Sequence, residues 1–170
     1  MSPEQWLPIA GYEGSYEVSD LGRVRSLGRV VIRGNGRTLP VRERIRKQST
    51  HPEGYLTVAL ALAGGQRTHK IHALVARAFH GDPAPGLEVC HDDGICTNNA
   101  VGNLRWGTHR ENVQDSVRHG THNMASRTHC PQGHEYAGDN LYVYPDGARR
   151  HCRECGRADS RRYRARKRAA

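Results

Sequence analysis

The sequence predicts a modular α+β protein with a β-rich N-terminal region, a central strand–loop–strand–helix unit and a small C-terminal module rich in Cys and His. Short runs of β-branched and aromatic residues, separated by glycine turns, fill the first 71 residues. Two strand-like runs around a Gly- and Asn-rich loop follow, and then a stretch with helical periodicity. With 19 Gly and one Phe among 170 residues, several small modules are expected rather than one large core.

Positive charge is concentrated at the C-terminal end of the chain. The formal net charge is +9, and residues 157–170 alone hold seven Arg or Lys and one Asp, a net +6. A merely solvated basic surface does not explain this concentration, so a polyanion is the expected partner, with nucleic acid first. We find no signal peptide and no apolar run of membrane-spanning length, so a cytoplasmic protein without a membrane partner is expected.

The region 1–71 is expected to be β-rich and to bind DNA. Arg23 and Arg25 alternate along one strand, so both would lie on one face and could follow a phosphate backbone. Arg44 and Arg46 repeat this pattern on a second basic strand, where protection of a sheet edge is an equally good explanation. A scaffold whose aromatic residues are simply core is compatible with either role.

Residues 72–119 are expected to form the central domain. Residues 72–79 show the apolar spacing of a short helix, on which His72 is expected to pack or cap rather than catalyse. Strands follow at 87–91 and 103–106, on either side of the polar loop.

A second helix is expected to begin at Thr108, because Glu111 three residues later completes a capping box. His119 and Gly120 would end this helix. Residues 120–129 have no periodicity and are expected to be a linker.

Three polar residues recur at the junctions of the central unit: His91, Asn103 and Asn112, at separations of 12 and 9 residues. In this strand–loop–strand–helix context they resemble the HNH nuclease motif, the ββα-metal fold, with Asn in third place as in phage homing endonucleases. The stretch Tyr-Glu-Gly-x-Tyr-Glu-Val-Ser followed by Gly-Arg-Val-Arg-Ser resembles the small N-terminal DNA-contacting motif that precedes HNH domains in those enzymes.

The resemblance implies a role for each of the three residues. His91 would be the general base that activates water, since histidine titrates near neutral pH. Asn112 would be a hard oxygen ligand for Mg²⁺ or Mn²⁺. Asn103 would brace the loop and orient His91 by hydrogen bonds.

The second ligand of the catalytic metal is an open question. The family often places Asp just before the catalytic histidine, but here that place is Cys90, and a thiol is a poor ligand for Mg²⁺. Asp92 lies two residues further on and would share the Cys90 face of a strand, so it could supply the carboxylate. Asp93 precedes a glycine and is expected to be a turn residue.

Residues 130–156 are expected to be a zinc-binding module. Cys130 and His134 form a Cys-x₃-His pair, Cys152 and Cys155 form a Cys-x₂-Cys pair, and 17 residues separate the two pairs. Three thiolates and one imidazole suit a closed, tetrahedral structural zinc site. Strand-forming residues and an Asp146-Gly147 turn between the pairs predict a zinc-ribbon-like hairpin. Free thiols or redox use would not explain the histidine.

The tail at 157–170 is expected to be helical and to continue along DNA. Its expected DNA contacts, together with Arg105 beside the HNH loop, are Arg161, Arg162, Arg164, Arg166, Lys167 and Arg168.

The predicted function is that of a phage-type HNH homing endonuclease, which would hydrolyse phosphodiester bonds of double-stranded DNA by a nick or a double-strand cut. If phage-encoded, it would act in the host cytoplasm. One alternative is a less specific HNH DNase for restriction, packaging or defence. Another is a non-catalytic DNA-binding regulator on the same scaffold. The sequence leaves the oligomeric state open and favours a monomer.

Overall fold

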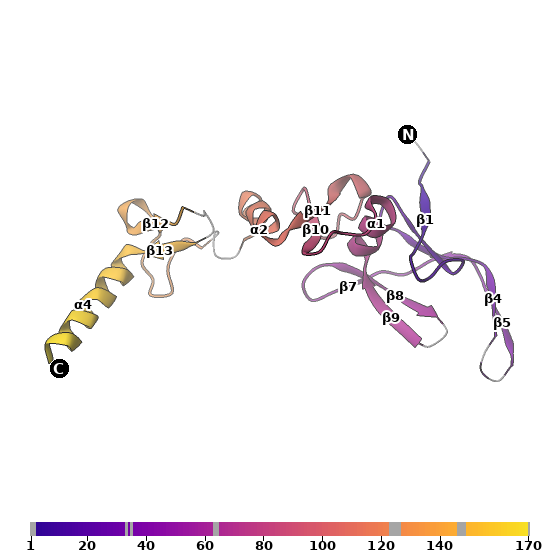
Figure 1. Cartoon of the computed structure of the whole chain (residues 1–170), viewed down its shortest axis with the longest axis horizontal. Coiled ribbons are helices and arrows are strands. Elements are labelled where there is room, and N and C mark those ends of the chain that lie inside the picture. The colour runs from indigo at the N-terminus through magenta and orange to yellow at the C-terminus, as the bar shows by residue number, and fades with distance from the viewer. Residues whose placement is uncertain are drawn as a thin grey trace. The chain divides into compact units, whose positions relative to one another are not determined.

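The computed structural model describes residues 3–32, 34, 36–62, 65–122, 127–145 and 149–169. The chain forms two compact units, Met1–His109 and Arg110–Ala170, called here the N-terminal and C-terminal units (Figure 1). Residues 123–126 of the expected linker and the expected turn at Asp146-Gly147 lie outside the described residues. Among the described residues, no helix is long and apolar enough to cross a membrane.

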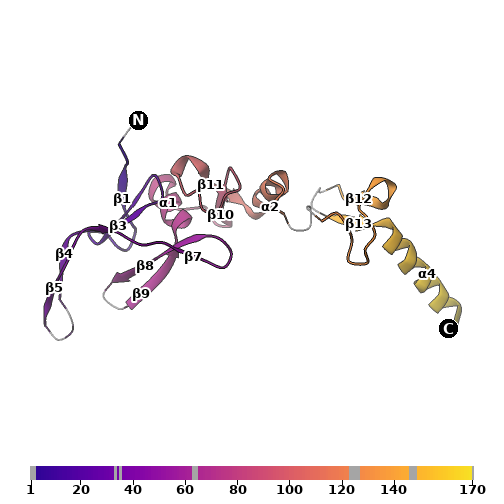
Figure 2. The same cartoon turned by 180° about the vertical axis from the view of Figure 1, so that it is seen from behind.

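Short antiparallel strands fill the first part of the N-terminal unit, as the sequence predicted. Four of them form a sheet in the order β1-β2-β3-β6, with bounds Trp6–Pro8, Tyr16–Ser19, Val24–Ser26 and Arg44–Ile45. A separate hairpin, which projects from the rest of this unit in Figures 1 and 2, pairs β4 (Arg29–Ile32) with β5 (Thr38–Val41). A three-stranded sheet contains β7 (Ser49–Thr50), β8 (Leu56–Leu62) and β9 (Gly65–Lys70).

The predicted strand–loop–strand–helix unit is present. Helix α1 (Ile71–His80) precedes it and ends at Gly81, whose φ of 78° is a left-handed conformation that glycine adopts without strain. Strand β10 (Leu87–His91) pairs antiparallel with β11 (Leu104–Thr108), and His91 lies opposite Leu104. A short 3₁₀ helix, η1 (Val101–Asn103), closes the loop between these strands. Helix α2 (His109–Arg118) follows directly.

One core joins the N-terminal sheets to helix α1 and strand β11. Its buried members include Val18 and Val24 from the first sheet, Leu60 from β8, Val75 from α1 and Leu104 from β11. The boundary expected between residues 71 and 72 therefore runs through a single core. Residues 1–71 and the segment that follows them each contribute only a small apolar face to this core. Burying one of its large apolar side chains stabilises the fold by about 1.5–3 kcal/mol.

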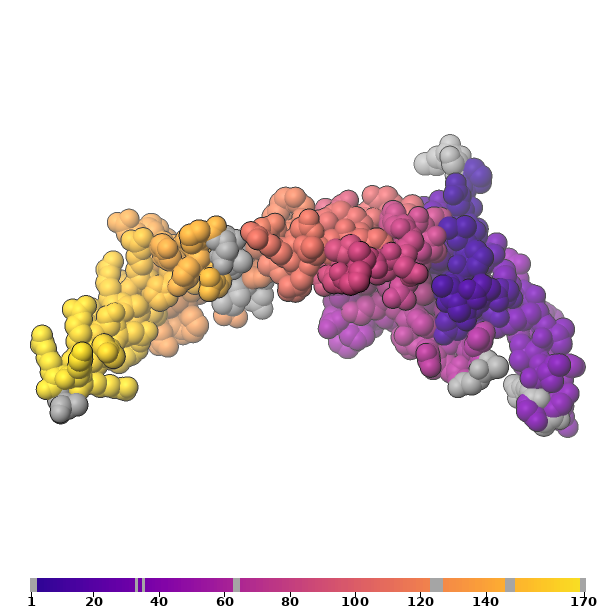
Figure 3. Space-filling model, in the orientation of Figure 1, coloured from indigo at the N-terminus to yellow at the C-terminus, as the bar shows by residue number. Residues whose placement is uncertain are grey.

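The C-terminal unit contains a short antiparallel strand pair that leads directly into a long helix. Strands β12 (Leu141–Val143) and β13 (Arg150–Cys152) pair antiparallel, and η2 (Gly138–Asn140) precedes them. Helix α4 (Arg153–Ala169) begins at the residue after β13, and its side chains form the yellow end of the chain in Figure 3. The boundary expected between residues 156 and 157 thus falls inside one continuous helix.

Candidate functional site

His91 lies at the end of β10 in a largely buried position, with 9% of its surface exposed. Its Nε2 lies 3.3 Å from Asn99 Oδ1, and its ring meets the His72 ring edge-on with centroids 5.2 Å apart. Burial lowers the pKa of His91, although the hydrogen bond to Asn99 and the charge of Asp93 act in the opposite direction. A neutral imidazole at pH 7 can accept a proton, which a general base requires.

The loop after His91 is held by reciprocal hydrogen bonds between Asp93 and Asn103. Asn103 Nδ2 donates to Asp93 Oδ1 at 2.9 Å and to the Asn98 carbonyl at 2.8 Å, while Asn103 Oδ1 accepts from Asp93 N at 3.0 Å. Hydrogen bonds from Asn98 and from the Ile95 amide lower the pKa of Asp93 to about 2. The loop-bracing role of Asn103 and the turn role of Asp93 match expectation.

No hydrogen bond between the Asn103 side chain and His91 occurs among the described contacts, so the expected role of Asn103 in orienting His91 stays a prediction. Asn103 uses its amide on the loop, and Asn99 is the residue within hydrogen-bonding distance of the imidazole. Sequence patterns did not single out Asn99, because Asn98 and Asn99 are adjacent in a polar loop and are equally able to form hydrogen bonds there.

His72 is a packed residue, as expected. Its ring meets Tyr55 edge-on at 4.8 Å, and its buried Nδ1 has no hydrogen-bond partner among the described residues. Burial, aided by the neighbouring His91 and Lys70, lowers the pKa of His72 to about 4.

This buried histidine predicts acid sensitivity of the fold. Since the unfolded pKa is about 6.5, the unfolded chain binds the proton more readily, and stability is lost as pH falls from about 6.5 toward 4. Between pH 7 and 5 the wild type should lose on the order of 1–2 kcal/mol more free energy of unfolding than His72→Phe. Urea unfolding at both pH values measures this difference, and equal pH dependence of the two proteins would contradict it.

The two candidates for the second metal ligand lie in different environments. Cys90 is fully buried, whereas the Asp92 side chain is 52% exposed and its Oδ1 accepts a hydrogen bond from Arg105 Nε at 2.9 Å. Strand β10 ends at His91, so the strand alternation expected to place Asp92 on the Cys90 face stops one residue short. Burial and softness both count against Cys90 as a ligand for a hard cation.

Asn112 lies in α2, beyond the end of the N-terminal unit. Its partnership with His91 at one metal ion therefore stays a prediction.

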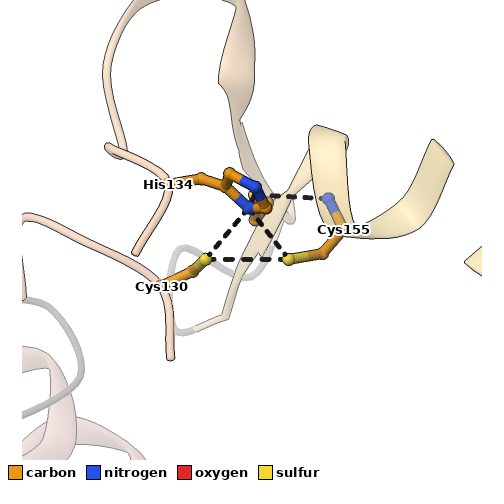
Figure 4. A group of neighbouring side chains, drawn as sticks. Cys130, His134 and Cys155 are labelled. Carbon is orange, nitrogen blue, oxygen red and sulfur yellow. Dashed lines mark hydrogen bonds between the residues drawn. The ribbon is translucent and has the colours of Figure 1, made fainter. Parts of the chain in front are cut away.

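The C-terminal unit brings the four expected zinc ligands together. The ligand atoms of Cys130, His134, Cys152 and Cys155 all lie within 4.8 Å of one another, and Figure 4 shows three of these side chains pointing toward a common centre. The Cys130 and Cys155 sulfurs are 3.6 Å apart, and His134 Nδ1 lies 3.3–3.7 Å from the three sulfurs. Two ligands about 2.3 Å from a tetrahedral ion are separated by about 3.8 Å, so the cluster has the size of a metal site.

Two residues that sequence reasoning missed support this cluster. Glu154 Oε2 lies 3.2 Å from His134 Nε2, the ring nitrogen that faces away from the sulfurs. Such a carboxylate fixes the tautomer and orientation of a metal-binding imidazole. Asn140 Oδ1 lies 3.4 Å from Cys152 Sγ and accepts from Glu154 N at 2.9 Å. Only the place of Glu154 inside the Cys-x₂-Cys pair could have indicated its role.

The expected N-terminal DNA-contacting arginines are engaged by carboxylates. Arg23 pairs with Glu4, while Arg25 pairs with Glu17 at 2.6 Å and Glu43 at 3.4 Å. The guanidinium of Arg25 lies 4.5 Å from the centroid of Trp6. DNA phosphates would compete with these ion pairs.

The second basic strand does not present one uniform face. Arg44 is exposed on β6, but Arg46 is only partly exposed. Arg46 Nη2 donates to the Ala59 carbonyl at 3.3 Å, and its Nε is buried without a hydrogen-bond partner among the described residues. Arg46 is thus a structural residue that attaches its segment to β8, and its expected DNA contact is not supported.

Helix α4 presents the tail arginines to solvent. The expected contacts Arg161, Arg162, Arg164, Arg166, Lys167 and Arg168 are all exposed. A shallow groove of about 680 Å³ follows the helix, lined by His151, Arg153, Gly156, Arg157, Ser160, Arg161 and Arg164. Arg153 and Arg157 extend the expected set, and their helical spacing to Arg161 and Arg164 was available from the sequence.

Comparison with known proteins agrees with this arrangement. Residues 4–61 match the family described as the NUMOD4 motif, and residues 69–114 match the family described as HNH endonuclease. The chain combines a NUMOD4 motif with an HNH domain. His91, Asn99 and Asn103 all lie within the matched HNH segment, and the paired Arg23 and Arg25 lie within NUMOD4.

Similar proteins carry the same domain. DNA endonuclease I-HmuI of Bacillus phage SP01 is 36% identical over 121 residues, which cover 71% of this chain and 62% of I-HmuI. An uncharacterized HNH endonuclease of Acanthamoeba polyphaga mimivirus is 28% identical over 68% of this chain and 31% of that protein. A solved structure of DNA binding and cleavage by the HNH homing endonuclease I-HmuI matches with a TM-score of 0.56 at 35% identity, over 72% of this chain and 63% of that one. The chain therefore spans less than two thirds of these relatives.

Proposed function

We propose that this NUMOD4–HNH protein is a metal-dependent homing endonuclease that hydrolyses phosphodiester bonds of double-stranded DNA. The observation that carries the proposal is the position of His91, largely buried at the end of β10 inside the HNH segment and within hydrogen-bonding distance of Asn99. The similarity to I-HmuI, whose solved structure concerns DNA binding and cleavage, supports DNA as substrate. The protein would act in the cytoplasm, as a monomer.

In the proposed reaction, His91 takes a proton from the attacking water. Asn112 would hold Mg²⁺ or Mn²⁺ together with a carboxylate, for which Asp92 is the better-placed candidate because Cys90 is buried. A divalent ion at this place supplies charge stabilisation for the transition state and for the leaving oxygen. Arg105, paired with Asp92, would compensate the carboxylate or contact phosphate.

The Cys₃His cluster would hold one structural Zn²⁺. Thiolate and imidazole ligands, a separation suited to a tetrahedral ion, and the Glu154 partner of His134 support this assignment. Because α4 carries Cys155, the ion would also fix the start of the basic helix, which would then bind the DNA backbone.

A cleavage assay tests the function. Purified protein is incubated with phage-genome DNA and Mg²⁺, with EDTA as control, and the cut ends are mapped by sequencing. Cleavage at one long, unique recognition sequence supports a homing endonuclease, while cleavage at many sequences favours the less specific DNase. DNA binding without Mg²⁺-dependent cuts favours the non-catalytic regulator.

The assignment of Asp92 predicts a change in metal requirement. Asp92→Asn removes one charged oxygen ligand, so the Mg²⁺ concentration for half-maximal cleavage should rise, by about 10-fold or more. Cys90→Ser is the matched control and should shift it little. Mg²⁺ titration of the cleavage rate measures both, and a silent Asp92→Asn beside an inactive Cys90→Ser would reverse the assignment.

A further inference from the structure

Asn99 is a buried amide that faces the imidazole of His91. It is 4% exposed, and its Oδ1 lies 3.3 Å from His91 Nε2. On its other side, Nδ2 donates to the Thr97 carbonyl at 3.4 Å. This second hydrogen bond fixes the orientation of the amide, because a side chain flipped by 180° would place Asn99 Oδ1 against the Thr97 carbonyl oxygen. The amide oxygen therefore faces His91 as an acceptor.

The backbone of Asn99 lies against Gly22, in the turn between β2 and β3 of the NUMOD4 motif. A Cβ added at Gly22 would lie 2.7 Å from Asn99 Cβ and 3.0 Å from the Asn99 carbonyl oxygen. Real Cβ atoms do not approach so closely, so only glycine allows this contact. Gly22 also has a φ of 79°, which disfavours any side chain.

Hydrogen bonds connect this turn both to the loop that carries Asn99 and to other segments of the N-terminal region. The Asp20 carbonyl accepts from Val101 N at 2.7 Å, two residues after Asn99. Gln48 Nε2 donates to the Gly22 carbonyl at 2.9 Å, and Gln5 N donates to Asp20 Oδ1 at 3.1 Å. The NUMOD4 turn thus connects the N-terminal sheet to the loop segment that carries Asn99.

We propose that Asn99 is a positioning residue for His91, and that the Gly22 turn of the NUMOD4 motif holds Asn99 in place. The motif would then support the catalytic centre directly, besides any contact with DNA. This inference rests on the proposed nuclease function for its kinetic part, but its structural part does not depend on activity.

The contact determines which ring nitrogen of His91 acts. An amide oxygen accepts a hydrogen bond only from a protonated nitrogen, so Nε2 carries the hydrogen in the neutral ring. Nδ1 then keeps its lone pair and is the atom that accepts the proton of water. Without Asn99 this hydrogen bond would no longer favour one tautomer of the neutral ring.

The first test replaces Asn99. Asn99→Leu keeps the volume without an acceptor, and Asn99→Asp keeps an acceptor oxygen. Asn99→Leu should slow single-turnover cleavage at saturating DNA by about 10- to 100-fold with metal-free DNA affinity within about threefold, and Asn99→Asp should recover most of the rate. Nitrogen-15 NMR of the histidine rings should show His91 as the Nε2–H tautomer in the wild type and a mixture in Asn99→Leu.

The second test separates the contact from backbone strain. Gly22→Ala and Gly11→Ala impose the same left-handed strain, since their φ values are 79° and 76°, but Gly11 has no atom within 4 Å of an added Cβ. Gly22→Ala should disturb the His91 tautomer and the cleavage rate, and Gly11→Ala should leave both near wild type. Thermal unfolding shows whether each variant is folded.

The NMR result is independent of nuclease activity. If the wild type does not cleave DNA, the tautomer still tests the positioning role, and the proposed function fails alone. A wild-type tautomer in folded Asn99→Leu would overturn the inference. An Nδ1–H tautomer in the wild type, or equal effects of Gly22→Ala and Gly11→Ala, would also overturn it.

Discussion

His91→Ala is expected to slow DNA cleavage by about 10²–10⁴-fold, the contribution of a general base. The affinity for DNA should stay close to that of the wild type, because the imidazole is largely buried and acts on water rather than on the duplex. Single-turnover cleavage at saturating Mg²⁺ measures the rate, and binding in EDTA measures the affinity.

His51→Ala is the control, since His51 is a partly exposed histidine of the same unit that pairs with Glu53 and does not contact His91 in the described contacts. Its rate should match the wild type. Wild-type turnover by His91→Ala would remove His91 from the reaction, and equal loss in both variants would indicate a general effect of losing a histidine.

Cys152→Ser is expected to abolish binding of one Zn²⁺ per chain, which metal analysis measures. Structural zinc in finger peptides contributes about 10–16 kcal/mol of apparent binding free energy, and the module has few buried apolar side chains to replace it. Residues 130–156 should unfold, while the N-terminal unit keeps its own core and helix α2, which carries Asn112, lies outside the unfolded segment. Cys96→Ser, outside the cluster, should retain the metal.

The same variant should bind DNA more weakly and with a shallower salt dependence. Helix α4 would lose its attachment through Cys155, so fewer of its arginines could meet phosphates at once. Each lost phosphate contact lowers the slope of log affinity against log salt by about 0.9. Total loss of cleavage at low salt, in a variant whose first 118 residues remain folded, would mean that the zinc module is part of the active site.

Local patterns predicted the elements of this fold well. The spacing of apolar residues predicted α1, the Gly- and Asn-rich loop predicted the β10–β11 arrangement, and the Cys and His pairs predicted a cluster whose four atoms do converge. These features depend on residues close in sequence, or on a spacing that one ion imposes.

Contacts between distant segments were not predictable in the same way. Strand alternation predicted Arg46 as a phosphate contact, but its guanidinium donates to the Ala59 carbonyl of β8 and its Nε is buried. From the sequence, Asn98 and Asn99 were equally good candidates for loop hydrogen bonds. Only the contact between Gly22 and the Asn99 backbone, made by distant segments of the chain, distinguishes Asn99. The single core across residues 71 and 72 also depends on tertiary packing that periodicity does not encode.

The shared core limits how the N-terminal region could be replaced by that of another protein. A recombination joint between residues 71 and 72 would separate Val18 and Val24 from Val75 and Leu104, which fill one interior. A foreign N-terminal segment would have to reproduce that interior and a glycine at the position of Gly22. Chimeric enzymes with new targets are therefore better joined after residue 118, where α2 ends, than at the edge of the NUMOD4 motif.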